Sequence, residues 1–144
     1  MRVDPIVATV AAVTALAVID GDTLQLGAER YRLLGIDAAE IHRAECDAER
    51  RLGELTKHRL EALIRTGRVE LRPDEPAKRD LYGRLLVHLL VNGEDAACIL
   101  IREGYARPWT GRREDWCVNV DTAESTAGTD CAAAGPSAPP APGN

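Results

Sequence analysis

Charged residues gather in three short segments, each at the end of a stretch that is otherwise apolar. The first, residues 20–23, reads Asp-Gly-Asp-Thr; the second, residues 32–40, holds an arginine, an aspartate and a glutamate; the third, residues 79–84, ends in arginine. Carboxylates hold hard cations and accept protons, whereas guanidinium groups bind phosphates through two parallel hydrogen bonds. These residue types together suit the hydrolysis of a phosphate ester.

Each segment alone has a simpler explanation. Residues 20–23 fit a type I′ hairpin turn, in which Asp and Gly are favoured. Arg32 lies on a strand that otherwise looks buried and needs an anionic partner, which an internal ion pair with Glu40 would supply. Residues 79–84 fit a solvated charged turn. The presence of all three segments in one short chain favours a functional site.

The first part of the chain predicts three consecutive strands. Apolar stretches cover 7–19, 23–26 and 31–36, and short turn signals separate them, which is typical of a β-meander. The first stretch also resembles an export signal, because Arg2 precedes it and Ala15-Leu16-Ala17 resembles a cleavage site. We favour the strand, since the stretch is rich in Val, Thr and Ala and cleavage would remove most of it.

The middle of the chain predicts a long helix over residues 47–64. Leucine and isoleucine recur there at three- and four-residue spacing, and Gly67 is placed to end the helix. Strands at 69–71 and 85–91 and a short helix at about 95–103 follow. This order fits an α+β, mainly β fold: a five-stranded OB-fold barrel with a capping helix and a second short helix.

Composition divides the chain into a folded domain at 1–117 and a tail at 118–144. The 144 residues suit one domain. The tail is rich in Ala, Pro and Gly without periodicity, so we expect it to be disordered. The net charge is −5, and all 18 basic residues precede the tail. A body this close to neutral predicts contacts with few phosphates and no broad DNA-binding surface.

Four cysteines without C-x-x-C spacing argue against a zinc site. Cys46 and Cys117 flank the ends of the folded body, and a disulfide between them is our preferred pairing. Thiols that are all reduced are the alternative.

Taken together, the three segments resemble the staphylococcal-type thermonuclease family. The family's signature is D-G-D-T, then R-L-x-x-x-D-x-x-E, a helix, and D-x-Y-G-R before a strand, and all of these occur here in order. The resemblance extends from about Val7 to Trp109. It implies a metal-dependent endonuclease that hydrolyses phosphodiester bonds in DNA, RNA or both and leaves 3′-phosphate products.

The resemblance implies a metal site and a base. Asp22 and Asp37, with the backbone carbonyl of Ala38, correspond to ligands of one Ca²⁺ ion. Glu40 corresponds to the carboxylate that positions or deprotonates the attacking water.

The resemblance also implies the residues that bind substrate. Arg32 and Arg84 correspond to the catalytic pair that grips the scissile phosphate. Tyr82 corresponds to a tyrosine that contacts phosphate. Trp109 is the nearest match to the aromatic residues that hold the terminal base.

The sequence departs from the family's pattern at several points. Asp37-Ala38-Ala39-Glu40 replaces the commoner D-T-P-E, and the loss of proline removes a rigid φ beside Glu40. Leu81 replaces a residue that is frequently cationic or polar. The predicted tail begins where the best-known family member has a third helix, so we expect slower turnover with all catalytic charges present.

Other functions fit parts of the sequence. A catalytically silent thermonuclease-like module that binds nucleic acid or protein would typically have lost charged residues that are all present here. A plain OB-fold binder needs exposed aromatic residues and a basic groove, and this chain has no Phe. A cysteine hydrolase built on Cys98 and His88 lacks a motif around either residue. The only serines, Ser125 and Ser137, lie in the tail, which argues against a serine hydrolase.

The expected partner is DNA or RNA, preferably single-stranded or unpaired. We expect neither a membrane nor an obligatory protein partner. A disulfide and the hazard of nuclease activity inside a cell favour a periplasmic or extracellular location, although the export signal is not convincing.

Overall fold

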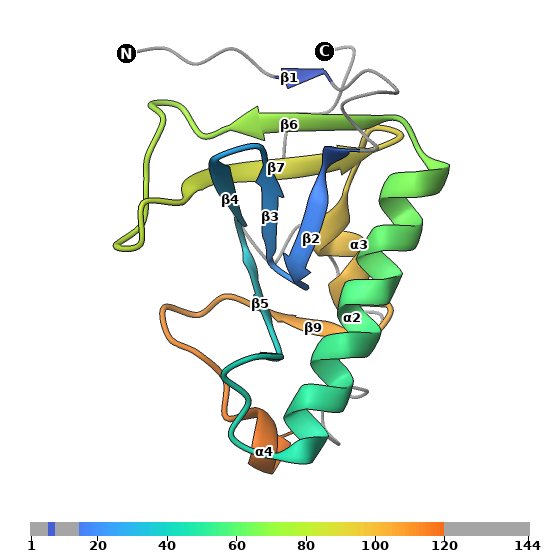
Figure 1. Ribbon diagram of the computed structural model, residues 1–144, viewed down its shortest axis with the longest axis vertical. Helices are drawn as coiled ribbons and strands as arrows, with labels where there is room; N and C mark the ends of the chain where they lie inside the picture. Colours follow the sequence, from blue (N-terminus) through green and yellow to red (C-terminus); the bar gives the residue numbers. More distant parts are fainter. Residues whose placement is uncertain (1–5, 8–14, 120–144) are drawn as a thin grey trace.

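The computed structural model describes residues 6–7 and 15–119 (Figure 1). Its strands are β1 Ile6–Val7, β2 Ala17–Asp20, β3 Thr23–Leu26, β4 Glu29–Leu33, β5 Ile36–Ala38, β6 Val69–Pro73, β7 Leu85–Val91, β8 Glu94–Asp95 and β9 Ala106–Pro108. Its helices are α2 Asp47–Thr66, α3 Ala96–Arg102 and α4 Trp116–Asn119. The predicted α+β, mainly β class is confirmed.

The strands form one large sheet and one small one. The large sheet has the order β1-β6-β7-β4-β3-β2, with β8 also paired to β7, and the small sheet pairs β5 with β9. Gly35, with a φ of 79°, separates β4 from β5, so that β5 leaves the large sheet. The element order is consistent with the predicted OB-type fold, but the ladders among the described residues do not close into a ring.

Helix α2 is the long helix that the sequence predicted; its first turn lies beside α4, and its later turns pack against α3 and β2 (Figure 1). Cys46 caps its first turn through a hydrogen bond from the N–H of Glu49 to the cysteine sulfur. The helix ends at Thr66, two residues beyond the predicted range, and Gly67 follows as its C-cap, as predicted. Gly67 has an extended φ of −123°, and a Cβ there would collide with Val91, so close packing requires the glycine.

The hairpin that carries residues 20–23 packs tightly against α2. Neither Gly21 nor Asp22 has a positive φ, so the turn is not the type I′ turn that residue preference indicated. A Cβ on Gly21 would collide with the side chain of Thr56 on α2. The glycine is therefore required because the turn lies against the helix, and this contact fixes where Asp22 points.

Two sequence predictions differ from the structure at the chain's ends. The stretch predicted as one strand over 7–19 contains two separate strand segments, because β1 pairs with β6 whereas β2 pairs with β3. Residues 8–14 between them, and Arg2 of the possible export signal, lie outside the described residues, whereas Ala17 of its candidate cleavage site begins β2. Helix α4 continues to Asn119, two residues into the predicted disordered tail, and the rest of that tail also lies outside. Within the described residues, no helix is long and apolar enough to cross a bilayer.

Candidate active site

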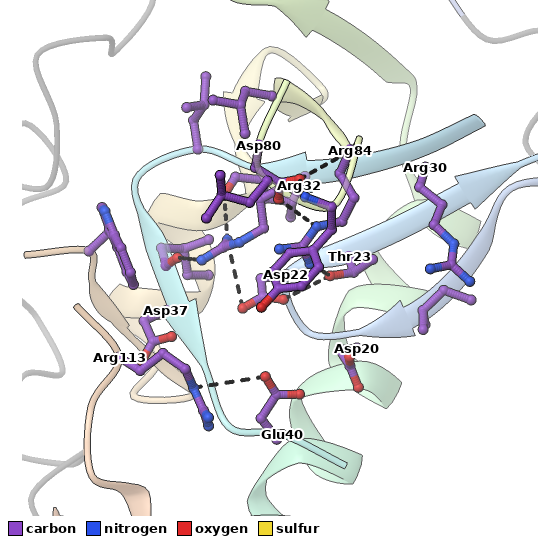
Figure 2. Close-up of a pocket in the computed structure, with 18 of the residues that line it drawn as sticks. Asp20, Asp22, Thr23, Arg30, Arg32, Asp37, Glu40, Asp80, Arg84 and Arg113 are labelled. Atoms are coloured by element: carbon purple, nitrogen blue, oxygen red, sulfur yellow. Dashed lines mark hydrogen bonds and ion pairs between the residues drawn. The ribbon is translucent and has the colours of Figure 1, made fainter. Parts of the chain in front are cut away.

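A cavity of about 660 Å³ lies where the three charged segments meet (Figure 2). Seven of the eight residues predicted for the site line it: Asp22, Arg32, Asp37, Glu40, Tyr82, Arg84 and Trp109. The eighth, Ala38, is buried on β5 and donates its backbone N–H to Oδ2 of Asp22 at 3.3 Å. His88 and Cys98, the residues of the alternative cysteine hydrolase, are not among the described residues that line the cavity.

Arg32 is fixed in the cavity by main-chain and side-chain acceptors. Its Nη1 donates to the carbonyl of Leu33 at 2.7 Å and its Nη2 to the carbonyl of Ile36 at 2.8 Å. Nη1 also lies 3.7 Å from Oδ2 of Asp22. The anionic partner of this arginine is therefore Asp22, and not Glu40 as the simple salt-bridge alternative required.

Thr23 links the second arginine to the same carboxylate. Its hydroxyl donates to Oδ1 of Asp22 at 3.0 Å and accepts a hydrogen bond from Nη1 of Arg84 at 2.9 Å. Arg84 also donates from Nε to Oδ2 of Asp80 at 2.6 Å. The chain of contacts from Arg32 through Asp22 and Thr23 to Arg84 holds the two guanidinium groups in one place before any ligand binds.

The turn before β7 orients Arg84 through Asp80. Oδ1 of Asp80 accepts the backbone N–H groups of Tyr82 and Arg84 at 2.9 and 3.0 Å. Burial acts to raise the pKa of Asp80, but the hydrogen bonds from Arg84 and Tyr82 outweigh it and hold that pKa below its usual value. Asp80 therefore stays ionised and fixes the guanidinium of Arg84 by charge and by geometry.

Two aromatic side chains lie at the exposed rim of the cavity. Tyr82 is 69% exposed, and the guanidinium carbons of Arg84 and Arg43 lie 5.3 and 6.0 Å from the centre of its ring. Trp109 is 42% exposed, and Arg32 lies 5.7 Å from its ring centre. Each aromatic ring is thus adjacent to one of the two central arginines and keeps an accessible face.

Asp37 is held from outside the cavity by residues far along the chain. Its Oδ2 accepts the backbone N–H of Glu114 at 2.8 Å and the indole N–H of Trp116 at 3.1 Å. Burial raises the pKa of Asp37, and the hydrogen bond from Glu114 offsets part of the rise.

Glu40 faces a negative environment. Burial raises its pKa, and the charges of Asp20 and Asp22 raise it further, whereas Arg113 lowers it. The Nε of Arg113 lies 3.9 Å from Oε1 of Glu40 (Figure 2). Glu40 is therefore more basic than an ordinary surface glutamate, which suits a residue that accepts a proton near neutral pH.

The backbone of Glu40 also depends on a close approach to α2. A Cβ on Gly53 would lie 2.9 Å from the carbonyl oxygen of Ala39 and 2.8 Å from that of Glu40. Only glycine leaves room for the loop at this point, so Gly53 helps to set the position of the Glu40 carboxylate.

Several residues of the site were missed by sequence reasoning. Asp20 lines the cavity, and burial and the charge of Asp22 raise its pKa. Its Oδ1 is buried without a hydrogen-bond donor among the described residues. Asp20 belongs to a segment that the sequence singled out, but its position suggested only a turn. Arg113 and Glu49, which contact the Glu40 loop, carry no local signal that marks them.

The raised pKa values of Asp20, Asp37 and Glu40 predict how the stability of the metal-free protein depends on pH. A carboxyl group whose pKa is higher in the folded than in the unfolded protein binds its proton more tightly when folded. Its stabilising contribution is present below the unfolded pKa and is lost as pH rises through the folded pKa. We therefore expect the free energy of unfolding, measured with urea and a chelator, to increase as pH falls from about 7 towards about 5.

Asp20→Asn tests this prediction while keeping the side chain's shape. We expect the variant to be more stable than wild type at neutral pH, and to show a weaker gain on acidification. Glu29, Asp80 and Glu103 have lowered pKa values, so they lose their contribution only at lower pH and do not oppose this trend. A destabilised variant, or one with the full pH dependence, would contradict the prediction.

Comparison with known proteins agrees with this geometry. Residues 30–130 match the family described as staphylococcal nuclease homologue. The chain is also similar to the SPbeta prophage-derived endonuclease YokF and to endonuclease YncB, both of Bacillus subtilis (strain 168). Each is 32% identical over 99 residues, or 66% of this chain. The aligned part covers 33% of YokF and 46% of YncB, so the chain spans less than half the length of either relative.

The family match contains two of the three charged segments. The segment at 20–23 precedes the matched residues, and it is joined to them in space by the contacts of Asp22 with Arg32 and Ala38. The predicted resemblance is confirmed: this chain belongs to the staphylococcal nuclease homologue family.

Proposed function

We propose that the protein is a Ca²⁺-dependent endonuclease that hydrolyses phosphodiester bonds in DNA, RNA or both and leaves 3′-phosphate products. The observation that carries the proposal is the meeting of Arg32, Arg84 and Glu40 around Asp22 in one cavity. YokF and YncB are both named as endonucleases, which supports the same class of reaction.

The two arginines are suited to bind the scissile phosphate. Arginine stays protonated at any working pH, and its planar fork matches the oxygens of a phosphate. Arg32 is held by the carbonyls of Leu33 and Ile36, and Arg84 by Asp80 and Thr23. Because both guanidinium groups are held in advance, they stabilise the charge that builds on the phosphate oxygens at little reorganisation cost.

Glu40 is suited to accept the proton of the attacking water. The water oxygen forms a bond to phosphorus while its proton passes to the Glu40 carboxylate, and the bond from phosphorus to the 5′ oxygen breaks. The phosphate stays on the upstream 3′ oxygen, and the departing 5′ oxygen takes a proton from solvent. The raised pKa of Glu40, caused by burial and by Asp20 and Asp22, makes it a stronger base for this step.

Asp22 and Asp37, with the carbonyl of Ala38, would hold the cation. Their oxygens are the hard ligands that Ca²⁺ prefers. The buried Oδ1 of Asp20, which accepts no hydrogen bond within the described part of the chain, adds to the negative charge of this region. No group of three or more His, Cys, Asp or Glu side chains converges on one point within the described residues, so carbonyl, water and phosphate oxygens would complete the coordination. The cation, when bound, supplies positive charge that stabilises the transition state.

An unpaired strand suits the rim of the cavity better than a duplex. Tyr82 and Trp109 offer exposed rings on which unpaired bases can stack. Leu81, fully exposed beside Tyr82, supplies an apolar contact where a cation would favour phosphate. The site therefore contacts few phosphates and gains affinity from stacking of unpaired bases, which are not accessible in duplex DNA.

A 5′-labelled single-stranded oligonucleotide tests the products and the substrate together. With Ca²⁺ we expect internal fragments whose gel mobility changes after phosphatase treatment, because they carry 3′-phosphate. We also expect the annealed duplex to be cut more slowly. Fragments with 3′-hydroxyl ends would contradict the proposed direction of cleavage, and a faster reaction on the duplex would contradict the strand preference.

A further inference from the structure

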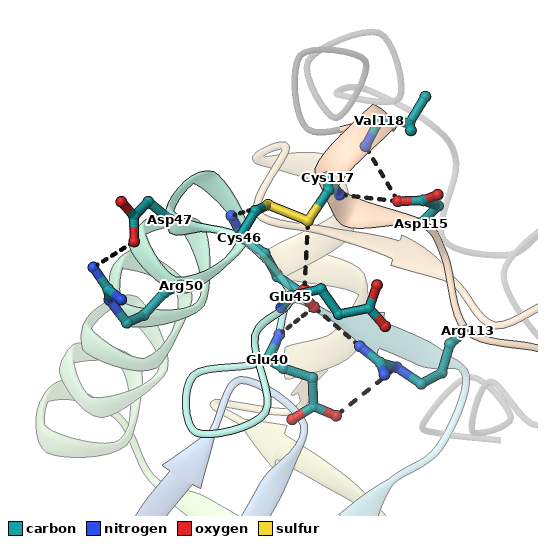
Figure 3. Close-up of a disulfide and its surroundings, with 10 residues drawn as sticks. Glu40, Glu45, Cys46, Asp47, Arg50, Arg113, Asp115, Cys117 and Val118 are labelled. Carbon is teal, nitrogen blue, oxygen red and sulfur yellow. Dashed lines mark hydrogen bonds and ion pairs between the residues drawn. A yellow bond between two sulfur atoms is a disulfide. The ribbon is translucent and has the colours of Figure 1, made fainter.

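Residues 113–117, which we call the clasp, lie against the loop that carries Glu40 (Figure 3). Arg113 joins Glu40 to Glu49: its Nε lies 3.9 Å from Oε1 of Glu40, and its Nη2 lies 3.0 Å from Oε2 of Glu49. Glu49 is only 2% exposed and also accepts the backbone N–H groups of Glu40 and Glu45, at 3.1 and 2.9 Å. Glu49 thus fixes the main chain of the loop, and Arg113 compensates its buried charge.

The clasp also holds the second carboxylate of the site. The N–H of Glu114 and the indole N–H of Trp116 both donate to Oδ2 of Asp37. Arg107 on β9 pairs with Glu114 at 3.0 Å and supports this contact. The clasp therefore touches both Asp37 and Glu40 without itself providing a ligand or a base.

Trp116 of the clasp lies in a small hydrophobic cluster apart from the main core. Trp116 is 1% exposed and packs with Ala39 and Leu52, and this cluster is separate from the main core of the sheet and α2. A small satellite cluster opens more easily than a large core. The clasp can therefore detach while the rest of the fold persists, unless something else ties it down.

A disulfide joins the clasp covalently to the Glu40 loop. Cys46 and Cys117 are bonded, with their Cα atoms 6.0 Å apart, which confirms the preferred pairing. Cys46 is the N-cap of α2 at the end of the Glu40 loop, and Cys117 is the last residue of the clasp (Figure 3). The bond joins residues separated by 71 positions, so it holds the clasp at a place that local structure cannot enforce.

We propose that the clasp is a positioning element for Asp37 and Glu40, with Arg113 and Trp116 as its positioning residues, and that the disulfide makes nuclease activity depend on an oxidising environment. This rests on the proposed function. A dithiol reductant gives two electrons and two protons to the Cys46–Cys117 bond, which becomes two thiols, while the dithiol closes to its own disulfide. The freed clasp then withdraws Arg113 from Glu40 and the two donors from Asp37.

Steady-state cleavage in Ca²⁺ tests the proposal on the oxidised protein and on the same protein treated with dithiothreitol. We expect reduction to lower kcat by about 10- to 100-fold, with a smaller change in KM and an unchanged far-UV circular dichroism spectrum. The double variant Cys46→Ser with Cys117→Ser should match the reduced protein and ignore dithiothreitol. Cys98→Ser, the matched control on α3, should keep the wild-type rate and its sensitivity to dithiothreitol.

Arg113 is tested separately in the oxidised protein, in which the disulfide is intact. These variants test the proposal even if the double cysteine variant does not fold. Arg113→Ala should lower kcat in the same direction, and Arg113→Lys should restore part of the loss. Its exposed neighbour offers a control, because Arg112→Ala should leave the rate unchanged. A disulfide with a merely structural role would lower the urea midpoint and leave kcat of the folded protein unchanged, and that result would overturn the proposal.

Fluorescence separates failure of this inference from failure of the proposed function. In Trp109→Phe, Trp116 is the only remaining tryptophan. Reduction should shift its emission to longer wavelength and increase its quenching by acrylamide, whether or not the protein cleaves nucleic acid. An inactive oxidised protein would reject the nuclease, whereas an active one whose Trp116 stays buried on reduction would reject the clasp.

Discussion

Replacing Glu40 with Gln is expected to lower kcat by about 10²- to 10⁴-fold, the usual contribution of a general base. The amide has the size of the carboxylate but cannot accept the proton of the attacking water. Burial and the charges of Asp20 and Asp22 already disfavour the ionised form of Glu40. We therefore expect the variant to be at least as stable as wild type at neutral pH, so that a loss of rate cannot be ascribed to unfolding.

Single-turnover cleavage and urea unfolding, measured side by side, check this prediction. The control is Glu54→Gln, which removes an exposed carboxylate from α2 and should leave both rate and stability near wild type. A Glu40→Gln enzyme within about threefold of the wild-type rate would remove Glu40 from the mechanism, because a general base contributes far more than that.

Replacing Arg84 with Ala is expected to lower kcat by about 10²- to 10³-fold, the effect of removing one preorganised donor from a transition state. Arg84 is aimed by Asp80 and by the hydroxyl of Thr23, and Thr23 in turn binds Asp22. Arg84→Lys should recover little, since an ammonium group cannot satisfy both acceptors and still present a fork to phosphate.

The balance between rate and binding gives the sharper test of Arg84. Arg84→Ala should weaken the binding of an oligonucleotide, measured without metal so that no cleavage occurs, by much less than it slows cleavage. The reason is that the interaction of Arg84 with the phosphate becomes stronger in the transition state. Arg68→Ala, a change of an exposed arginine beyond the end of α2, controls for the loss of one positive charge. Equal losses in binding and in rate would mean that Arg84 binds substrate and transition state alike.

Five charged residues of the site, Asp22, Arg32, Asp37, Glu40 and Arg84, were predictable because each belongs to a short motif at or near the end of an element with a clear pattern. β7 was predicted with its observed bounds, 85–91, since a short apolar run ends at Asn92-Gly93, and both turn residues have positive φ. Arg32 on β4 was identified as an arginine in need of an anion, and the structure pairs it with Asp22. Local rules suffice where the hydrophobic pattern fixes an element and the motif follows at its end.

The contacts that hold the site could not be predicted in this way. Glu49 has the appearance of an ordinary charge in the first turn of a helix, yet it is buried and paired with Arg113, 64 residues away. Asp37 is bound by Trp116, 79 residues away. Such pairs depend on tertiary packing, which no local spacing encodes.

Ca²⁺-dependent hydrolysis by the purified, oxidised protein is the most direct test of the central claim. Denatured DNA and RNA are each incubated with Ca²⁺ and, in parallel, with a chelator, and released fragments are measured over time. The proposed site predicts degradation of at least one substrate in Ca²⁺ and its loss in the chelator, with restoration when Ca²⁺ is returned. No degradation in Ca²⁺, Mg²⁺ or Mn²⁺, or degradation that persists in the chelator, would contradict it.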